Sequence, residues 1–318
     1  LAGTNLKLYN LIGTLRVEAA SGATASAEIS RQGADGAKLT VRNTGGTLAV
    51  VYPGNAFVYP ALGGNYETTV RVRDDGTFND DWDGNGGRKV RISSRGDGLS
   101  AWADIRVLVP AGAHLDLNLG MGKVTLANVN GTISVETSAG DVQATATAGA
   151  LSIDTGSGDV TVGTHNGDLS VDTGSGDIEL SSVTATTLSL DTGSGDIRVN
   201  GLAGTQLKVD TGSGDIVVTG ASVRGVHVDT GSGNIRLGLT GDVDDLSVDT
   251  GSGDVEVIAP SSLGVTVNIE TSSGDINTEF PLQVTRKGRD GLSGTIGNGK
   301  GTMSLETASG NVTLRKQP

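Results

Sequence analysis

A ten-residue stretch of the form Leu-Ser-Val-Asp-Thr-Gly-Ser-Gly-Asp-Ile recurs through the middle of the chain. With the acid before each Thr as the marker, successive copies are 18, 18, 19, 19, 19, 20, 21 and 36 residues apart. Stacked coils require near-identical residues at one interval, because equivalent positions of neighbouring coils pack against each other. The repeat therefore predicts a coil-by-coil architecture rather than one globular core. The markers are Glu136, Asp154, Asp172, Asp191, Asp210, Asp229, Asp249, Glu270 and Glu306.

Apolar and polar residues alternate on both sides of a glycine-rich corner in each repeat. Leu188 and Leu190 precede the corner at 193–196, and Ile197 and Val199 follow it. A period of two is typical of short β-strands, and glycine suits sharp turns with positive φ. We predict an all-β parallel β-solenoid (β-helix) of about 18–21 residues per coil, with an irregular β-rich N-terminal portion. The alternative is a barrel of antiparallel hairpins, since Gly-Ser-Gly also suits a hairpin turn.

Parallel stacking of the coils predicts which side chains lie above one another. Two inner files follow from the alternation, together with an outer file that includes His227. The first inner file is Leu169, Leu188, Leu207, Val226 and Leu246; the second is Val171, Leu190, Val209, Val228 and Val248; the outer file is Ser170, Ser189, Lys208, His227 and Ser247.

Composition divides the chain into three parts. Every aromatic residue except Phe280 lies in the first 102 residues, so that part must pack differently. Residues 115–279 hold 5 basic and 23 acidic residues, a net charge of −18. We expect divergent N-terminal β coils with an aromatic and Asp-rich insertion at 1–102, regular solenoid repeats at 103–279, and C-terminal coils with an insertion at 280–318. The final 36-residue interval is read as one coil with an insertion or as two divergent coils.

The acidic balance excludes several classes of partner. Nucleic acid requires a basic footprint, and anionic lipid headgroups attract basic rather than acidic surfaces. The chain has no cysteine and no apolar run long enough for a spanning helix, so we expect neither disulfides nor a direct membrane span. Leu1 in place of Met fits a processed chain whose export signal is not present.

These motifs together resemble the bacterial putative-adhesin family of β-strand-repeat (DUF4097-like) proteins. The resemblance rests on 13–18 (Gly-Thr-Leu-Arg-Val-Glu), the central array, 280–282 (Phe-Pro-Leu), 294–299 (Gly-Thr-Ile-Gly-Asn-Gly) and 305–312 (Leu-Glu-Thr-Ala-Ser-Gly-Asn-Val). It implies a right-handed parallel β-solenoid that is exported in bacteria, in the periplasm or at the cell surface, without an established activity. The segment from Tyr52 to Trp102 is longer than this resemblance leads us to expect.

The aspartate that follows each Gly-Ser-Gly corner is the main candidate for a site. These residues stack one coil apart, where their charges repel, so something must offset the repulsion. Capping of free corner amides is the first interpretation, since Asn234 and Asn311 occupy the same place. An ordered row of calcium ions is the second, because the motif is similar to calcium-binding nonapeptides. The residues are Asp159, Asp177, Asp196, Asp215, Asp254 and Asp275.

The Asp-rich and aromatic segment supplies two further candidates. Asp81, Asp83 and Asn85 match the first half of an EF-hand loop, although Ile92 stands where the bidentate Glu belongs. We therefore weigh a calcium-stiffened loop against a solvated one. Aromatic side chains suit interfaces and cores alike, so partner contact and core packing are equal alternatives for this segment. The candidate contacts are Tyr52, Tyr59, Tyr66 and Trp82.

No residue pattern indicates catalysis. The acids recur in every coil, as structural residues do, whereas a catalytic pair should break the pattern. We expect a non-catalytic, rigid solenoid scaffold or binding module of the bacterial cell envelope, with no cofactor. Its partner would be a surface ligand or a membrane-protein complex that it braces as an extrinsic accessory subunit. A calcium-binding surface adhesin and a polysaccharide-active solenoid enzyme are the remaining alternatives.

Overall fold

The computed structural model describes residues 5–62, 66–78 and 87–317. The chain forms two compact units, Leu1–Val160 and Thr161–Pro318. In the described residues almost all regular structure is β-strand, and the only helices are two 3₁₀ turns, η1 (Gly36–Lys38) and η2 (Pro60–Leu62). No helix among these residues is long or apolar enough to cross a membrane. The all-β prediction is confirmed.

The second unit consists of short strands joined at glycine corners. Its elements are β13 (His165–Asn166), β14 (Leu169–Thr173), β15 (Ile178–Thr192), β16 (Ile197–Thr211), β17 (Ile216–Ser222), β18 (Gly225–Thr230), β19 (Ile235–Leu239), β20 (Asp245–Ser252), β21 (Val255–Ala259), β22 (Val265–Ser273), β23 (Ile276–Thr278), β24 (Leu282–Lys287), β25 (Gly291–Ile296), β26 (Gly301–Ser309) and β27 (Val312–Lys316). Strand β12 (Val160–Val162) spans the unit boundary.

Successive coils of this unit pair in parallel and in register. Leu188 pairs with Leu169 and Leu207, and the same register continues to Val226 and Leu246. Both predicted inner files are buried, with every member at most 2% exposed. The parallel solenoid is therefore confirmed over the regular repeats, because a barrel of antiparallel hairpins would scatter these files.

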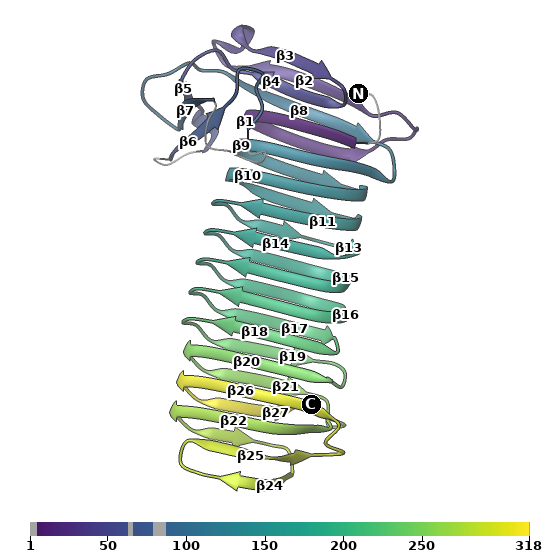
Figure 1. Cartoon of the computed structure of the whole chain (residues 1–318), viewed down its shortest axis with the longest axis vertical. Coiled ribbons are helices and arrows are strands. Elements are labelled where there is room, and N and C mark those ends of the chain that lie inside the picture. The colour runs from purple at the N-terminus through teal and green to yellow at the C-terminus, as the bar shows by residue number, and fades with distance from the viewer. Residues whose placement is uncertain (1–4, 63–65, 79–86, 318) are drawn as a thin grey trace. The chain divides into compact units, whose positions relative to one another are not determined.

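The end of the chain breaks the sequential order. Strand β26 pairs in parallel with β20 on one side and with β22 on the other (Figure 1). Strand β27 likewise pairs in parallel with both β21 and β23. Strand β25 then pairs antiparallel with both β22 and β24, which closes this end. Neither interpretation of the 36-residue interval predicts that β26 is inserted between β20 and β22. The interval gives only the number of residues that pass through β24 and β25 before the next copy of the repeat.

The first unit begins with a similar insertion. Strand β1 pairs in parallel with β9 on one side and with β4 and β8 on the other (Figure 1). Antiparallel strands β2 and β3 lie against β8 and β4, and β5, β7 and β6 form a separate sheet. The strands are β1 (Asn5–Ala19), β2 (Ser26–Gln32), β3 (Thr40–Thr44), β4 (Thr47–Val51), β5 (Ala56–Val58), β6 (Glu67–Val72), β7 (Arg88–Ser93), β8 (Trp102–Val109), β9 (Ala113–Ala127), β10 (Asn130–Thr145) and β11 (Thr147–Thr155).

Two of the aromatic residues predicted to contact a partner belong to the core instead. Tyr52 is 1% exposed, and its hydroxyl oxygen lies 2.7 Å from both Asn10 Oδ1 and the Ile12 carbonyl oxygen. Burial raises the pKa of Tyr52. Tyr59 is 6% exposed and packs against Trp102. Partner contact is therefore wrong for Tyr52 and Tyr59, because a buried ring offers no surface to a partner.

Of the other two aromatic candidates, only Tyr66 can be placed. It is 60% exposed, so partner contact stays a prediction there. Trp82 lies outside the described residues.

Candidate functional site

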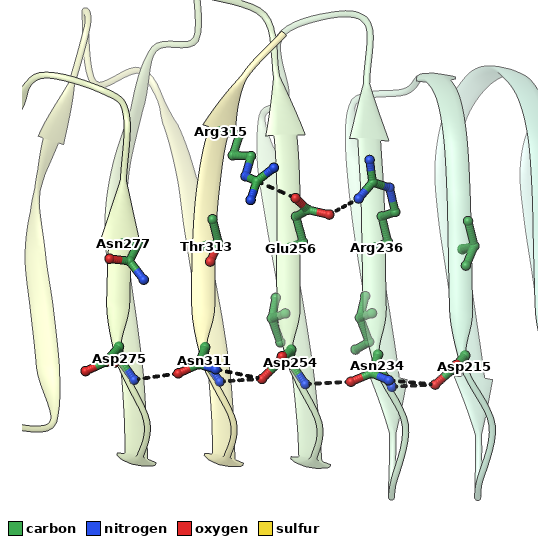
Figure 2. A pocket seen from close by; sticks show the side chains of 13 residues that line it. Asp215, Asn234, Arg236, Asp254, Glu256, Asp275, Asn277, Asn311, Thr313 and Arg315 are labelled. Carbon is green, nitrogen blue, oxygen red and sulfur yellow. Dashed lines mark hydrogen bonds and ion pairs between the residues drawn. The ribbon is translucent and has the colours of Figure 1, made fainter.

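The aspartates and asparagines after the glycine corners of the second unit form a hydrogen-bonded row, which we call the corner row. In it, the side-chain oxygen of one residue accepts a hydrogen bond from the backbone N–H of the equivalent residue in the next coil. Five members of this row are drawn in Figure 2. In spatial order the row is Asp177, Asp196, Asp215, Asn234, Asp254, Asn311 and Asp275.

The distances along the corner row are short and uniform. From Asp177 to Asp275, the six N–Oδ1 distances are 2.8, 2.9, 2.8, 3.0, 2.7 and 2.9 Å. Each of these bonds joins the corners of two neighbouring coils, where capping of free corner amides is the predicted role. In the first unit, Asp159 N–H donates to Asp141 Oδ1 over 3.2 Å in the same way. Local turn-capping therefore stays a prediction for these residues, while the bonds found are links between coils.

The structure supplies an offset for the repulsion along the corner row. Arg198 lies 2.7 Å from Asp196 and 3.9 Å from Asp177. Farther along, Asn234 separates Asp215 from Asp254, and Asn311 separates Asp254 from Asp275 (Figure 2). The Asn234 amide also donates to Asp215 Oδ1 over 3.2 Å. Because an amide carries no charge, this alternation relieves the repulsion without a bound cation.

A polar groove of about 650 Å³ runs over this end of the corner row. Glu256 on β21 forms ion pairs with Arg236 on β19 and with Arg315 on β27, whose Nε lies 3.1 Å from Glu256 Oε1 (Figure 2). Asn277 and Thr313 lie on the adjoining strands and line the same groove. The groove therefore offers charged, amide and hydroxyl groups that can hydrogen-bond a polar ligand.

The acids that precede the threonines form a second row, in which Asn does not alternate with the acids. Asp172, Asp191 and Asp210 pair directly across β14, β15 and β16. The pKa of Asp191 is raised, mainly by partial burial and secondly by the negative charges of Asp210 and Asp172. The pKa of Asp249 is raised in the same way, mainly by partial burial and secondly by the negative charges of Asp229 and Glu306. Like-charged neighbours thus disfavour ionisation along this row.

Asp191→Asn is expected to stabilise the protein by about 0.5–1 kcal/mol at pH 7 and low salt, since it removes repulsion from two neighbours. The raised folded-state pKa means that protonation favours folding, so the repulsion acts at neutral pH and vanishes as the pH falls below the unfolded value of about 3.9. Urea unfolding at pH 3, 5 and 7 measures this trend.

Asp196→Asn is the matched comparison within the same coil. The pKa of Asp196 is lowered, mainly by the hydrogen bond from the backbone N–H of Asp215 and also by the hydrogen bond and charge of Arg198. Ionised Asp196 therefore stabilises the fold. That stability is present above the unfolded pKa and is lost as the pH falls through the folded value. The substitution should give no gain at pH 7. Equal gains from both substitutions would contradict the distinction between the two rows.

Calcium binding stays a prediction at both of its candidate sites. Residues 5–62, 66–78 and 87–317 contain no group of three or more His, Asp or Glu side chains that could hold a metal ion. Asp81, Asp83 and Asn85 lie outside the described residues, so the calcium-loop hypothesis there stays a prediction. His227 is an exposed outward residue as expected, whereas His165 is 1% exposed and burial lowers its pKa.

Sequence reasoning found most members of the corner row but missed the groove. Arg236 and Glu256 are paired across the consecutive coils of β19 and β21, and Arg315 joins them only because β27 is inserted beside β21. A signal was available in the outward position two residues after each corner residue, where Arg236 and Glu256 stand one coil apart with opposite charges. No comparable feature of the sequence indicates that Arg315 lies beside Glu256.

Comparisons with known proteins place the chain in a family. No curated protein matches it. A solved structure, described as a putative cell adhesion protein from Clostridium sporogenes ATCC 15579, aligns over 98% of this chain and 92% of its own at 11% identity and a TM-score of 0.17. The family model described as Toastrack DUF4097 matches residues 150–315, more than half of the chain. The chain therefore belongs to the Toastrack DUF4097 family.

Proposed function

We propose that the protein is a non-catalytic scaffold and binding module of the bacterial cell envelope, located outside the cytoplasm. Its ligand would be a surface molecule or a neighbouring membrane-protein complex. The observation that carries this proposal is the structural role of the repeated acids. In the corner row their oxygens accept backbone amides of the next coil, so their recurrence serves coil stacking rather than a reaction.

The polar groove is the part of the second unit that best fits a binding role. Its side chains come from β17, β19, β21, β23 and β27 and from the corner residues that directly precede these strands, so strand pairing sets their spacing. Sites on paired strands hold their side chains at defined distances, which favours recognition of an extended polar partner. Ion pairing of Arg236 and Arg315 with Glu256 further restrains these long side chains.

Co-purification with native envelope membranes after gentle solubilisation tests this proposal. We expect the full chain to retain a defined component, and Asn277→Arg to lose it at least about tenfold, because the larger cation obstructs the groove. Ser170→Arg is the matched control, since Ser170 is exposed on β14, away from the groove-lining residues.

Two outcomes would overturn the proposal. One is equal loss in the two arginine variants, or no association by the wild type. The other is turnover of an acidic polysaccharide that a single Asp substitution abolishes, which would establish an enzyme instead.

A further inference from the structure

A second hollow, of about 530 Å³, lies in the first unit and differs from the polar groove in charge. We call it the cationic pocket. Three basic side chains and three threonines line it, with a single carboxylate. The lining residues are Lys7, Tyr9, Arg42, Thr44, Thr47, Ala49, Arg73, Asp75 and Thr77.

Strand register builds the floor of the cationic pocket. Across β3, β4 and β1, Thr44 pairs with Thr47 and Thr47 with Lys7. Two residues along, Arg42 pairs with Ala49 and Ala49 with Tyr9. Residues two apart on a strand share a face, so these two rungs point their side chains to the same side. Small Ala49, 2% exposed, and buried Tyr9 leave a hollow between the long side chains of Lys7 and Arg42.

A tight turn after β6 forms the wall. Arg73 N–H donates to the Thr77 carbonyl oxygen over 2.9 Å, and Gly76 N–H donates to the Arg73 carbonyl oxygen over 3.0 Å. The Thr77 hydroxyl donates to Asp75 Oδ1 over 2.8 Å, and Arg73 Nη1 lies 3.2 Å from Thr77 Oγ1. The turn therefore fixes Arg73 beside the floor, with Asp75 engaged by Thr77.

The pocket is lined by more basic than acidic side chains. Lys7 forms an ion pair with Asp116 over 3.5 Å. Arg42 is exposed and forms no ion pair or hydrogen bond through its guanidinium with any residue of 5–62, 66–78 or 87–317. Three cations thus face one lining carboxylate, in a chain whose net charge is −13. A solvated arginine needs no partner, but its convergence with Lys7 and Arg73 on one hollow favours an anion there.

We propose that the cationic pocket binds a tetrahedral oxyanion, a phosphate or sulfate group. Guanidinium groups bind such anions through two parallel N–H donors, lysine adds a compact charge, and threonine hydroxyls donate to the remaining oxygens. Donors that reach the hollow from the floor strands and from the turn suit a tetrahedral anion better than a planar carboxylate. This site is separate from the groove of the second unit and is independent of the function proposed above.

Isothermal titration of the full chain with inorganic phosphate, sulfate and acetate tests the proposal. We expect saturable binding of phosphate or sulfate by the wild type. Arg42→Gln should bind at least about tenfold more weakly, because it loses a charge-assisted hydrogen bond. Arg42→Lys should fall between the two, since it keeps the charge without the fork. Arg95→Gln is the control, because it removes the same charge from an exposed residue that does not line the pocket.

Each outcome of the titration decides something. No saturable binding by the wild type, or equal weakening by Arg42→Gln and Arg95→Gln, would overturn the site. Acetate bound as tightly as phosphate would overturn the preference for a tetrahedral anion. A phosphorylated monosaccharide and vesicles containing phosphatidic acid then separate the sources, because Arg42-dependent binding to one alone identifies a soluble ester or a lipid headgroup.

Discussion

Gly214→Ala is expected to lower the free energy of unfolding by about 2–5 kcal/mol. Gly214 has a φ of +151°, which L side chains rarely adopt. A β-carbon there would lie 2.0 Å from the Gly195 carbonyl oxygen and 2.6 Å from its carbon, atoms that belong to the backbone of the neighbouring coil. Because a backbone cannot turn aside as a side chain can, the two coils must separate at this corner. Urea unfolding monitored by circular dichroism measures the loss.

Gly241→Ala is the matched control for this substitution. A β-carbon at 241 would meet only Ser222 Oγ, at 3.6 Å, which is an ordinary contact. We expect a change within about 0.5 kcal/mol there. Equal stability of the two alanine variants would contradict the claim that the backbone of the neighbouring coil leaves no room for a side chain at position 214.

Ser247→Cys combined with Ser304→Cys is expected to yield a disulfide under mild oxidation, although 57 residues separate the two positions. These serines pair directly across β20 and β26. Paired residues of neighbouring strands lie about 4.8 Å apart, within the Cα separation that a disulfide spans. The natural chain has no cysteine, so no other thiol competes. Mobility on non-reducing gels and peptide mapping read out the bond.

Ser247→Cys combined with Asn268→Cys distinguishes the two possible coil orders. If the coils stacked in chain order, these residues would be neighbours, since they lie one 21-residue interval apart. In the structure Ser304 lies between them, paired with both. Their separation is then about two strand spacings, or roughly 9.6 Å, too far for a disulfide. Efficient cross-linking of this pair, with none between 247 and 304, would contradict the inserted strand.

The regular coils could be predicted from the sequence because their determinants are local and repeated. Each copy carries its own alternation and its own glycine corner, so the files of Leu188 and Leu190 follow from the interval alone. The corner row followed for the same reason, as far as Asp254. Its continuation to Asn311 and then Asp275 could not be predicted, because a sequence interval does not record which coil a strand joins.

The aromatic part of the chain resisted prediction for a different reason. Nothing in the neighbours of Tyr52 distinguishes a buried ring from an exposed one. Its partners Asn10 and Ile12 lie about forty residues earlier, on a strand that meets it only through tertiary structure. The cationic pocket is hidden from sequence analysis in the same way, since Lys7 and Arg42 come together only once β1, β4 and β3 are in register, and Arg73 reaches them from the turn after β6.

The insertion of β1 and β26 between other strands has a consequence for biogenesis. During vectorial synthesis β1 emerges before its partners β8 and β9, which follow only after some ninety residues. Strand β22 emerges well before β26, the parallel neighbour that joins it to β20. Contacts between distant segments form slowly. Nucleation therefore belongs to the sequential coils from β15 to β18, and β1 and β26 pair with their distant parallel neighbours late.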